Sequence, residues 1–121
     1  KENAEHDMLV DLARNDLGRI CKAGSIKILR EKYGKKFANL QHLVSDIEGE
    51  VDKNINVVDF FANIFPAGTL TGAPKIRTME NIAQTEKGSR GLYGGAGGYF
   101  SQENNGELAI GIRSFSLQNG V

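Results

Sequence analysis

Two glutamates near the start of the sequence have the type and spacing of a metal-binding pair. Glu2 and Glu5 are three residues apart, and in a helix this spacing places both carboxylates on one face, about 5–6 Å apart. They share that face with Met8, Leu9 and Leu12, where carboxylates need a cation or hydrogen bonds as compensation. A hard cation such as Mg²⁺ prefers oxygen ligands of this kind. The alternative is an ordinary helix start, at which acidic residues favour the positive end of the helix dipole.

The segment 66–75, with the sequence PAGTLTGAPK, could bind an anion. Glycine-rich backbone that opens a helix leaves N–H groups free for a carboxylate or a phosphate. Pro74 stands where a first-turn proline belongs, so a helix is expected to follow. The segment is not a Walker A loop, because the Gly-Lys-Ser/Thr ending is missing. An ordinary capped loop is the alternative.

A second glycine-rich run covers residues 93–99, with the sequence YGGAGGY. So many glycines weaken a strand unless the backbone must approach something closely. No helix is expected after it, which excludes a dinucleotide-binding fingerprint. Two interpretations stay open: a strand that lines a ligand, and a tightly packed crossing of sheet strands.

Arg113 and His42 are candidates for substrate binding and proton transfer. Arg113 is expected on one strand face with Ala109 and Gly111, whose small size leaves room for the guanidinium to reach a carboxylate with two hydrogen bonds. A structural salt bridge is the alternative. His42 is a candidate because histidine is the residue type best suited to acid–base chemistry near neutral pH, although a histidine in such a strand is more often a core residue. We expect a structural role for His6.

The elements that must position these residues are helices and hairpins in separate blocks. We predict helices over 2–20, over 57–65 with Asn56 as N-cap, and from Pro74 to Gly88. Strands are predicted over 26–33, 37–51, 93–101 and 107–117, with a turn at 34–36 and a loop at 66–72. Regular βαβ units are missing, so the predicted class is α+β with an antiparallel sheet and packed helices.

Composition narrows the range of partners. The 121 residues allow one domain, here taken as 1–121. Fifteen basic and fifteen acidic residues cancel, which favours neither nucleic acid nor an anionic membrane as a partner. The single Cys21 fits a reducing cytoplasm. No apolar run approaches the roughly 20 residues that span a bilayer, and no signal peptide opens the sequence.

The two ends predict a fragment. The sequence lacks an initiator Met, and its last predicted strand meets Asn119-Gly120 before stopping at Val121. Asn-Gly is a strong hairpin signal, so a partner strand is expected to be absent. An unpaired apolar edge tends to pair with another chain, and we expect self-association.

Five stretches occur in the order of a known family: residues 2–16, 41–45, 65–75, 90–99 and 109–114. Together they resemble the chorismate-utilising enzymes, which include anthranilate synthase component I, aminodeoxychorismate synthase component I, and isochorismate and salicylate synthases. The implied fold is part of a chorismate-binding, anthranilate synthase-like domain. The implied roles are a direct Mg²⁺ ligand at Glu5, and at Glu2 an acid that holds metal-bound water or assists the leaving 4-hydroxyl. His42 matches the histidine of proton transfer at that hydroxyl. Substrate contacts are implied at Gly68, Thr69, Tyr93 and Arg113.

The closest resemblance is to anthranilate synthase component I, because Gly94-Gly95-Ala96 precedes Gly97-Gly98-Tyr99. Gly97 departs from the usual apolar residue there. The resemblance implies that the parent enzyme converts chorismate and ammonia, supplied by a glutamine amidotransferase subunit, to anthranilate and pyruvate in tryptophan biosynthesis. Aminodeoxychorismate synthase component I and isochorismate synthase are alternatives, as is an inactive folded fragment with anion affinity alone. Further metal-binding glutamates are expected beyond Val121, so we expect the isolated chain to be inactive.

Overall fold

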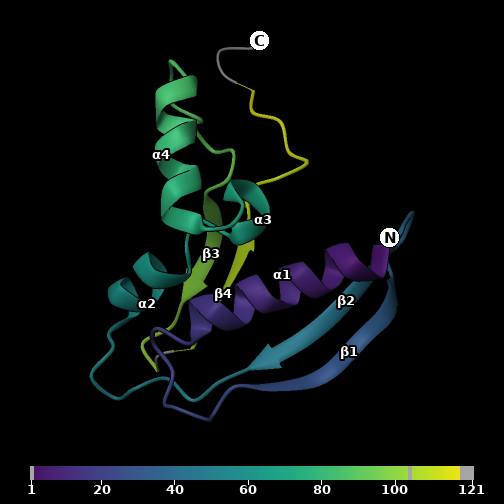
Figure 1. Ribbon diagram of the computed structural model, residues 1–121, viewed down its shortest axis with the longest axis vertical. Coiled ribbons are helices and arrows are strands. Elements are labelled where there is room, and N and C mark those ends of the chain that lie inside the picture. The colour runs from purple at the N-terminus through teal and green to yellow at the C-terminus, as the bar shows by residue number, and fades with distance from the viewer. Residues whose placement is uncertain (1, 104, 118–121) are drawn as a thin grey trace. The chain divides into compact units, whose positions relative to one another are not determined.

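The computed structural model describes residues 2–103 and 105–117. The chain divides into two compact units, Lys1–Thr69 and Leu70–Val121. Its elements, labelled in Figure 1, are α1 (Glu2–Leu17), β1 (Lys27–Lys36), β2 (Gln41–Glu48), α2 (Val57–Ile64), α3 (Gly68–Thr71), α4 (Lys75–Thr85), β3 (Ala96–Phe100) and β4 (Gly106–Ile110). Each sheet is an antiparallel pair, so the predicted α+β class is confirmed.

The first unit is built on the β1–β2 hairpin. Its ladder runs from Lys27 opposite Glu48 to Lys36 opposite Gln41, with two register shifts in β1. Helix α1 lies along this hairpin and packs against β2 and α2 (Figure 1). Val10 and Ile20 are the buried apolar residues, at 8% and 2% exposure. The core of this unit is therefore small, and apolar side chains of the hairpin stay exposed.

The turn of the β1–β2 hairpin does not lie at residues 34–36, where Gly34 had indicated it. β1 continues through 34–36, and the chain reverses at 37–40, where the Phe37 N–H donates to the Leu40 carbonyl over 2.8 Å. Gly34 pairs with Leu43 inside the ladder. A Cβ at Gly34 would overlap the side-chain amide nitrogen of Gln41 and lie 3.4 Å from its Cδ. The glycine thus makes room for a cross-strand side chain, and the predicted turn at 34–36 is wrong.

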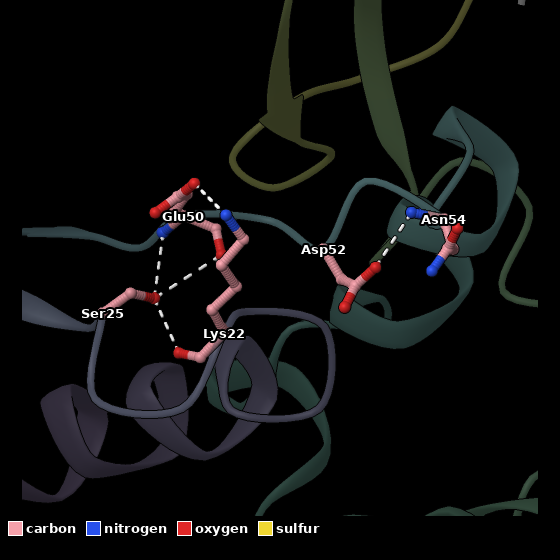
Figure 2. A network of polar contacts seen from close by, with 5 residues as sticks. All are labelled: Lys22, Ser25, Glu50, Asp52 and Asn54. Atoms are coloured by element: carbon pink, nitrogen blue, oxygen red, sulfur yellow. Dashed lines mark hydrogen bonds and ion pairs between the residues drawn. The ribbon is translucent and has the colours of Figure 1, made fainter.

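A polar clasp closes the other end of the hairpin (Figure 2). The Ser25 hydroxyl donates to the Lys22 carbonyl over 2.8 Å and accepts the Glu50 N–H over 3.1 Å. Lys22 donates its own N–H to the Glu50 carbonyl over 2.8 Å, and its ammonium pairs with the Glu50 carboxylate. Asp52 then accepts the Asn54 N–H over 2.9 Å and turns the chain towards α2. These contacts hold the segment that follows α1 beside the end of β2.

Asn56 caps α2 as its sequence predicts. The Asn56 side-chain oxygen accepts the N–H groups of Val58 and Asp59, each over 2.9 Å. This satisfies two of the unpaired donors that every helix start presents. The helix ends at Ile64, and Phe65 donates its N–H back to the Phe61 carbonyl.

The second unit holds α4 and the β3–β4 hairpin. The hairpin ladder runs from Ala96 opposite Ile110 to Phe100 opposite Gly106. Both strands are shorter than predicted. Gly111 still donates its N–H to the Gly95 carbonyl, but its own carbonyl accepts the Gly94 N–H, and the Ile112 N–H turns back to the Ile110 carbonyl, each over 2.9 Å, so the regular ladder stops there. Arg113 follows in a left-handed conformation with φ of 50°. The predicted placement of Arg113 on a strand is therefore wrong.

Within the described ranges, no helix has the length and apolar character needed to cross a membrane.

Candidate functional site

The first turn of α1 carries the two predicted metal ligands. Glu2 and Glu5 both lie in that turn, and both side chains are exposed. The helix face that carries them is open here, since Met8 on the same face is itself 53% exposed. Among residues 2–103 and 105–117, no three His, Cys, Asp or Glu side chains form a group that could hold a metal. The two carboxylates fit one side of a hard, oxygen-preferring cation.

His42 lies in β2, opposite Lys35. Its ring meets the ring of Phe37 edge-on, with centroids 5.9 Å apart, and the Lys35 ammonium lies 5.6 Å from the same phenyl centroid. The histidine is half-buried, which leaves part of its ring accessible. His6 on α1 contacts Ser45, three residues after His42 on the same strand, at 2.7 Å between Nε2 and Oγ. The structure therefore brings the glutamate-bearing helix against the histidine-bearing strand.

The segment 66–75 is more ordered than the loop that was predicted. It contains the short helix α3, and α4 begins at Lys75 directly after Pro74. A Cβ at Gly68 would lie 3.0 Å from Cδ1 of Leu12 on α1. Gly68 therefore lets this backbone approach α1 closely. Thr69 is exposed beside it. Lys75 is buried at 8% exposure, a feature that the sequence pattern did not indicate.

In the second unit, the segments that carry Tyr93 and Arg113 are hydrogen-bonded neighbours. Gly94, directly after Tyr93, donates its N–H to the Gly111 carbonyl over 2.9 Å, and Gly111 lies two residues before Arg113. Both candidate side chains are exposed. The backbone pairing thus places the aromatic ring of Tyr93 and the guanidinium of Arg113 on neighbouring segments of the chain. A site that binds a ring bearing a carboxylate requires such a pair of side chains.

Arg90 supports Tyr93 and was not identified from the sequence. Its guanidinium lies 5.7 Å from the Tyr93 ring centroid and donates to Glu86 over 2.6 Å and 2.5 Å. These hydrogen bonds hold the pKa of Glu86 below its usual value. Both residues lie beyond the end of α4 at Thr85, so helical spacing does not account for the pair.

Two interpretations of the 93–99 run were open, a strand that lines a ligand and a tightly packed crossing of strands, and the space around each glycine partly distinguishes them. A Cβ at Gly98 would overlap the backbone carbonyl oxygen of Glu107 on β4, whereas a Cβ at Gly97 would meet nothing within 4 Å. Close strand packing therefore requires glycine at position 98. Gly97 faces open space, and the structure imposes no packing reason for its small size.

A charged cluster on the hairpin lowers the pKa of a carboxyl group, Asp46. Arg30 donates from Nε to Asp46 over 2.8 Å, and the Tyr33 hydroxyl donates to the same carboxylate over 3.0 Å. The Arg30 guanidinium also stacks on the Tyr33 ring, 4.2 Å from its centroid. Hydrogen bonds from Arg30 and then Tyr33 lower the pKa of Asp46. The cluster ties β1 to β2 across the second register shift, between Arg30 and Tyr33.

The described residues form an α+β fold of helices and antiparallel hairpins. The family model described as chorismate binding enzyme matches residues 1–121, and the chain belongs to this family.

Relatives and solved structures agree with this assignment. The chain is 47% identical over 121 residues to anthranilate synthase component 1 of Mycolicibacterium smegmatis, covering 100% of this chain and 23% of the relative. It is 49% identical over 118 residues to the protein of the same name from Thermococcus kodakarensis, covering 98% and 27%. The crystal structure of anthranilate synthase component I from Streptococcus pneumoniae matches with a TM-score of 0.84 at 43% identity, covering 93% of this chain and 26% of that one. The chain thus spans about a quarter of the length of the relatives it matches.

Proposed function

We propose that this chain is part of an anthranilate synthase component I, which converts chorismate and ammonia to anthranilate and pyruvate in tryptophan biosynthesis. The observation that carries the proposal is the identity of 47% and 49% to two proteins of that name over 100% and 98% of the chain. The lone thiol of Cys21 suits a reducing cytoplasm as the place of action. Ammonia is supplied by a glutamine amidotransferase subunit of the parent enzyme.

Glu5, with Glu2 one turn before it, would hold Mg²⁺. Support comes from two exposed carboxylates in the first turn of α1, which offer oxygen donors for one side of a cation. Mg²⁺ needs about six oxygens in near-octahedral geometry, so ligands from other parts of the full-length enzyme and from water complete the site. When bound, the metal would offset the charge of a substrate carboxylate and help to orient it.

The chain's other side chains would bind the substrate and move a proton. His42 serves as the acid that protonates the leaving 4-hydroxyl of chorismate, a role that suits a half-buried imidazole. Arg113 grips a carboxylate of the dianion through its guanidinium fork, and Tyr93 on the adjacent backbone contacts the ring and enolpyruvyl group. Gly68 and Thr69 contribute contacts from the segment that lies on α1.

Related chorismate enzymes make other products. The residue at position 97 leaves these related enzymes as alternative assignments. Gly97 stands where the anthranilate synthase pattern has an apolar residue, and no packing in the described structure demands a glycine there. Aminodeoxychorismate synthase component I and isochorismate synthase are the competing assignments. The alternative that is not an enzyme is a folded fragment that binds anions without catalysing a reaction.

The site is tested by titrating Mg²⁺ against chorismate consumption in the full-length protein. We expect Glu5→Gln to remove most activity and the Mg²⁺ response, because an amide is a weaker ligand than a carboxylate. Asp11→Asn is the matched control, since Asp11 lies on the same helix and pairs only locally with Arg14 at 3.3 Å. Wild-type turnover by Glu5→Gln with an unchanged Mg²⁺ response would remove Glu5 from the site.

A further inference from the structure

Four polar residues join the first turns of α1 to the β1–β2 hairpin. His6 Nε2 and Ser45 Oγ share a hydrogen bond of 2.7 Å. Ser45 Oγ also accepts the backbone N–H of Lys32 over 3.0 Å, and the Lys32 ammonium pairs with Asp7 at 2.7 Å. The contacts form a closed ring, because His6 and Asp7 are consecutive on α1. We call His6, Asp7, Lys32 and Ser45 the α1 anchor.

The hairpin is deformed at the point where it meets the helix. A register shift lies between Arg30 and Tyr33 of β1, and Lys32 within it has a φ of 50°. A lysine rarely adopts this left-handed conformation, and such outliers persist only where surrounding contacts hold them. Bulges of this kind re-aim a side chain. Here Lys32 is held by its N–H at Ser45 and by its ammonium at Asp7.

The rest of α1 is held differently. Val10, in the middle of the helix, is buried at 8% exposure, and Leu12 lies against Gly68. These apolar contacts are non-directional and permit the helix to roll or slide slightly. The hydrogen bond at His6 and the ion pair at Asp7 fix the orientation of the helix relative to the hairpin. These two residues directly follow Glu5.

We propose that the α1 anchor positions the carboxylates of Glu5 and Glu2 for metal binding, an inference that rests on the proposed function. The anchor residues are positioning residues, because they contact one another and, through Lys32, the neighbouring Glu31 at 3.6 Å. Metal sites need ligands within about 0.5 Å of the productive geometry. Outer-shell partners of a metal site change affinity or activity by about 10- to 100-fold when they are lost.

Ser45 is the informative position, because its hydroxyl serves both His6 and Lys32. The test uses the full-length protein and measures Mn²⁺ binding by electron paramagnetic resonance, the Mg²⁺ concentration for half-maximal activity, kcat and KM. We expect Ser45→Ala to weaken Mn²⁺ binding by about tenfold or more and to lower kcat comparably, with KM for chorismate nearly unchanged. Ser45→Thr keeps the hydroxyl on a strand that suits threonine and should restore both values.

Ser25→Ala is the matched control. The Ser25 hydroxyl also bridges two backbone groups of the first unit, at Lys22 and Glu50, but it lies in the clasp at the other end of the hairpin. We expect this variant to lower the melting temperature without changing the Mn²⁺ affinity of the folded protein. Asp7→Asn, which keeps the side-chain size and removes the ion pair, supplies a second anchor variant should Ser45→Ala fail to fold, and we expect a metal affinity several-fold weaker than wild type.

The outcomes separate the two proposals. If wild type binds Mn²⁺ and consumes chorismate while Ser45→Ala and Asp7→Asn bind the metal equally well, the anchor inference is overturned and the proposed function stands. Equal damage by Ser45→Ala and Ser45→Thr would also overturn it, because the shared hydroxyl would then be irrelevant. If wild type neither binds the metal nor consumes chorismate, both proposals fail.

Discussion

Replacing Gly98 by alanine tests whether the glycine-rich run 93–99 is shaped by strand packing. Gly98 pairs with Leu108 in the β3–β4 ladder. The new methyl group would overlap the Glu107 carbonyl oxygen and lie 2.8 Å from its carbonyl carbon and 2.9 Å from the Leu108 Cα, against 3.4–4 Å in ordinary contacts. All three atoms are backbone, so no side chain can rotate away. The strands must separate and their hydrogen bonds must lengthen.

Overpacking of this kind costs about 1–3 kcal/mol and occasionally more, and the backbone contact puts Gly98→Ala near the upper end, at about 3 kcal/mol. For a chain of this size each kcal/mol lowers the melting temperature by about 3–4 °C, so we expect a fall of about 10 °C. Thermal denaturation measures the loss, and amide hydrogen exchange should show faster exchange in β3 and β4. Gly97→Ala is the control, because a Cβ there meets nothing within 4 Å. It should be neutral or stabilise the chain by about 0.4–1 kcal/mol through the unfolded state. Equal melting temperatures for the two variants would refute the packing explanation.

Three further predictions concern the hairpin cluster, the proton donor and the isolated chain. The lowered pKa of Asp46 means that its stabilising contribution is present above about pH 4, the unfolded value, and is lost as the pH falls through the lowered folded value. Asp46→Asn should therefore melt below wild type at pH 7, with a gap that closes in strong acid; a gap constant with pH would contradict this. His42→Ala in the full-length enzyme should lower kcat by about 10²–10⁴-fold while KM stays similar, and a kcat within about twofold of wild type would return His42 to a packing role. The 121-residue chain alone should not turn over chorismate and should self-associate in light scattering, because the two-stranded hairpin exposes Leu29 at 57% and Phe37 at 50%. Steady product formation by a monodisperse monomer would contradict both expectations.

Local chemistry made the helices and hairpins predictable. Asn56 caps α2 as predicted because its short side chain competes for backbone donors at a helix start. The α4 helix follows Pro74 as predicted, although the proline stands at the N-cap, one residue before the helix, and not in its first turn. The order of elements and the antiparallel class needed no more than hydrophobic spacing and turn residues.

Tertiary context decided the features that the sequence did not predict. Glycine is typical of turns, so Gly34 indicated one. In the structure the absence of a Cβ at Gly34 leaves space for the side chain of Gln41 on the opposite strand. Arg113 follows an alternating strand pattern, but the Gly111 carbonyl accepts the N–H of Gly94 and Ile112 turns back to the Ile110 carbonyl, which ends the ladder before Arg113. The sequence placed Glu2 and Glu5 on the apolar arc of α1, and in the structure both side chains are exposed. At Gly34 and Gly111 a neighbour on the paired segment sets the outcome, which spacing along one element cannot reveal.

The identity of the product tests the central claim most directly. The full-length protein would be incubated with chorismate, Mg²⁺ and ammonium, and its products separated and identified by mass spectrometry together with the fluorescence of anthranilate. The proposed function predicts anthranilate and pyruvate in equal amounts, with formation that depends on ammonium. Accumulation of 4-amino-4-deoxychorismate or of isochorismate in place of anthranilate would contradict it and assign the chain to a different enzyme of the same family.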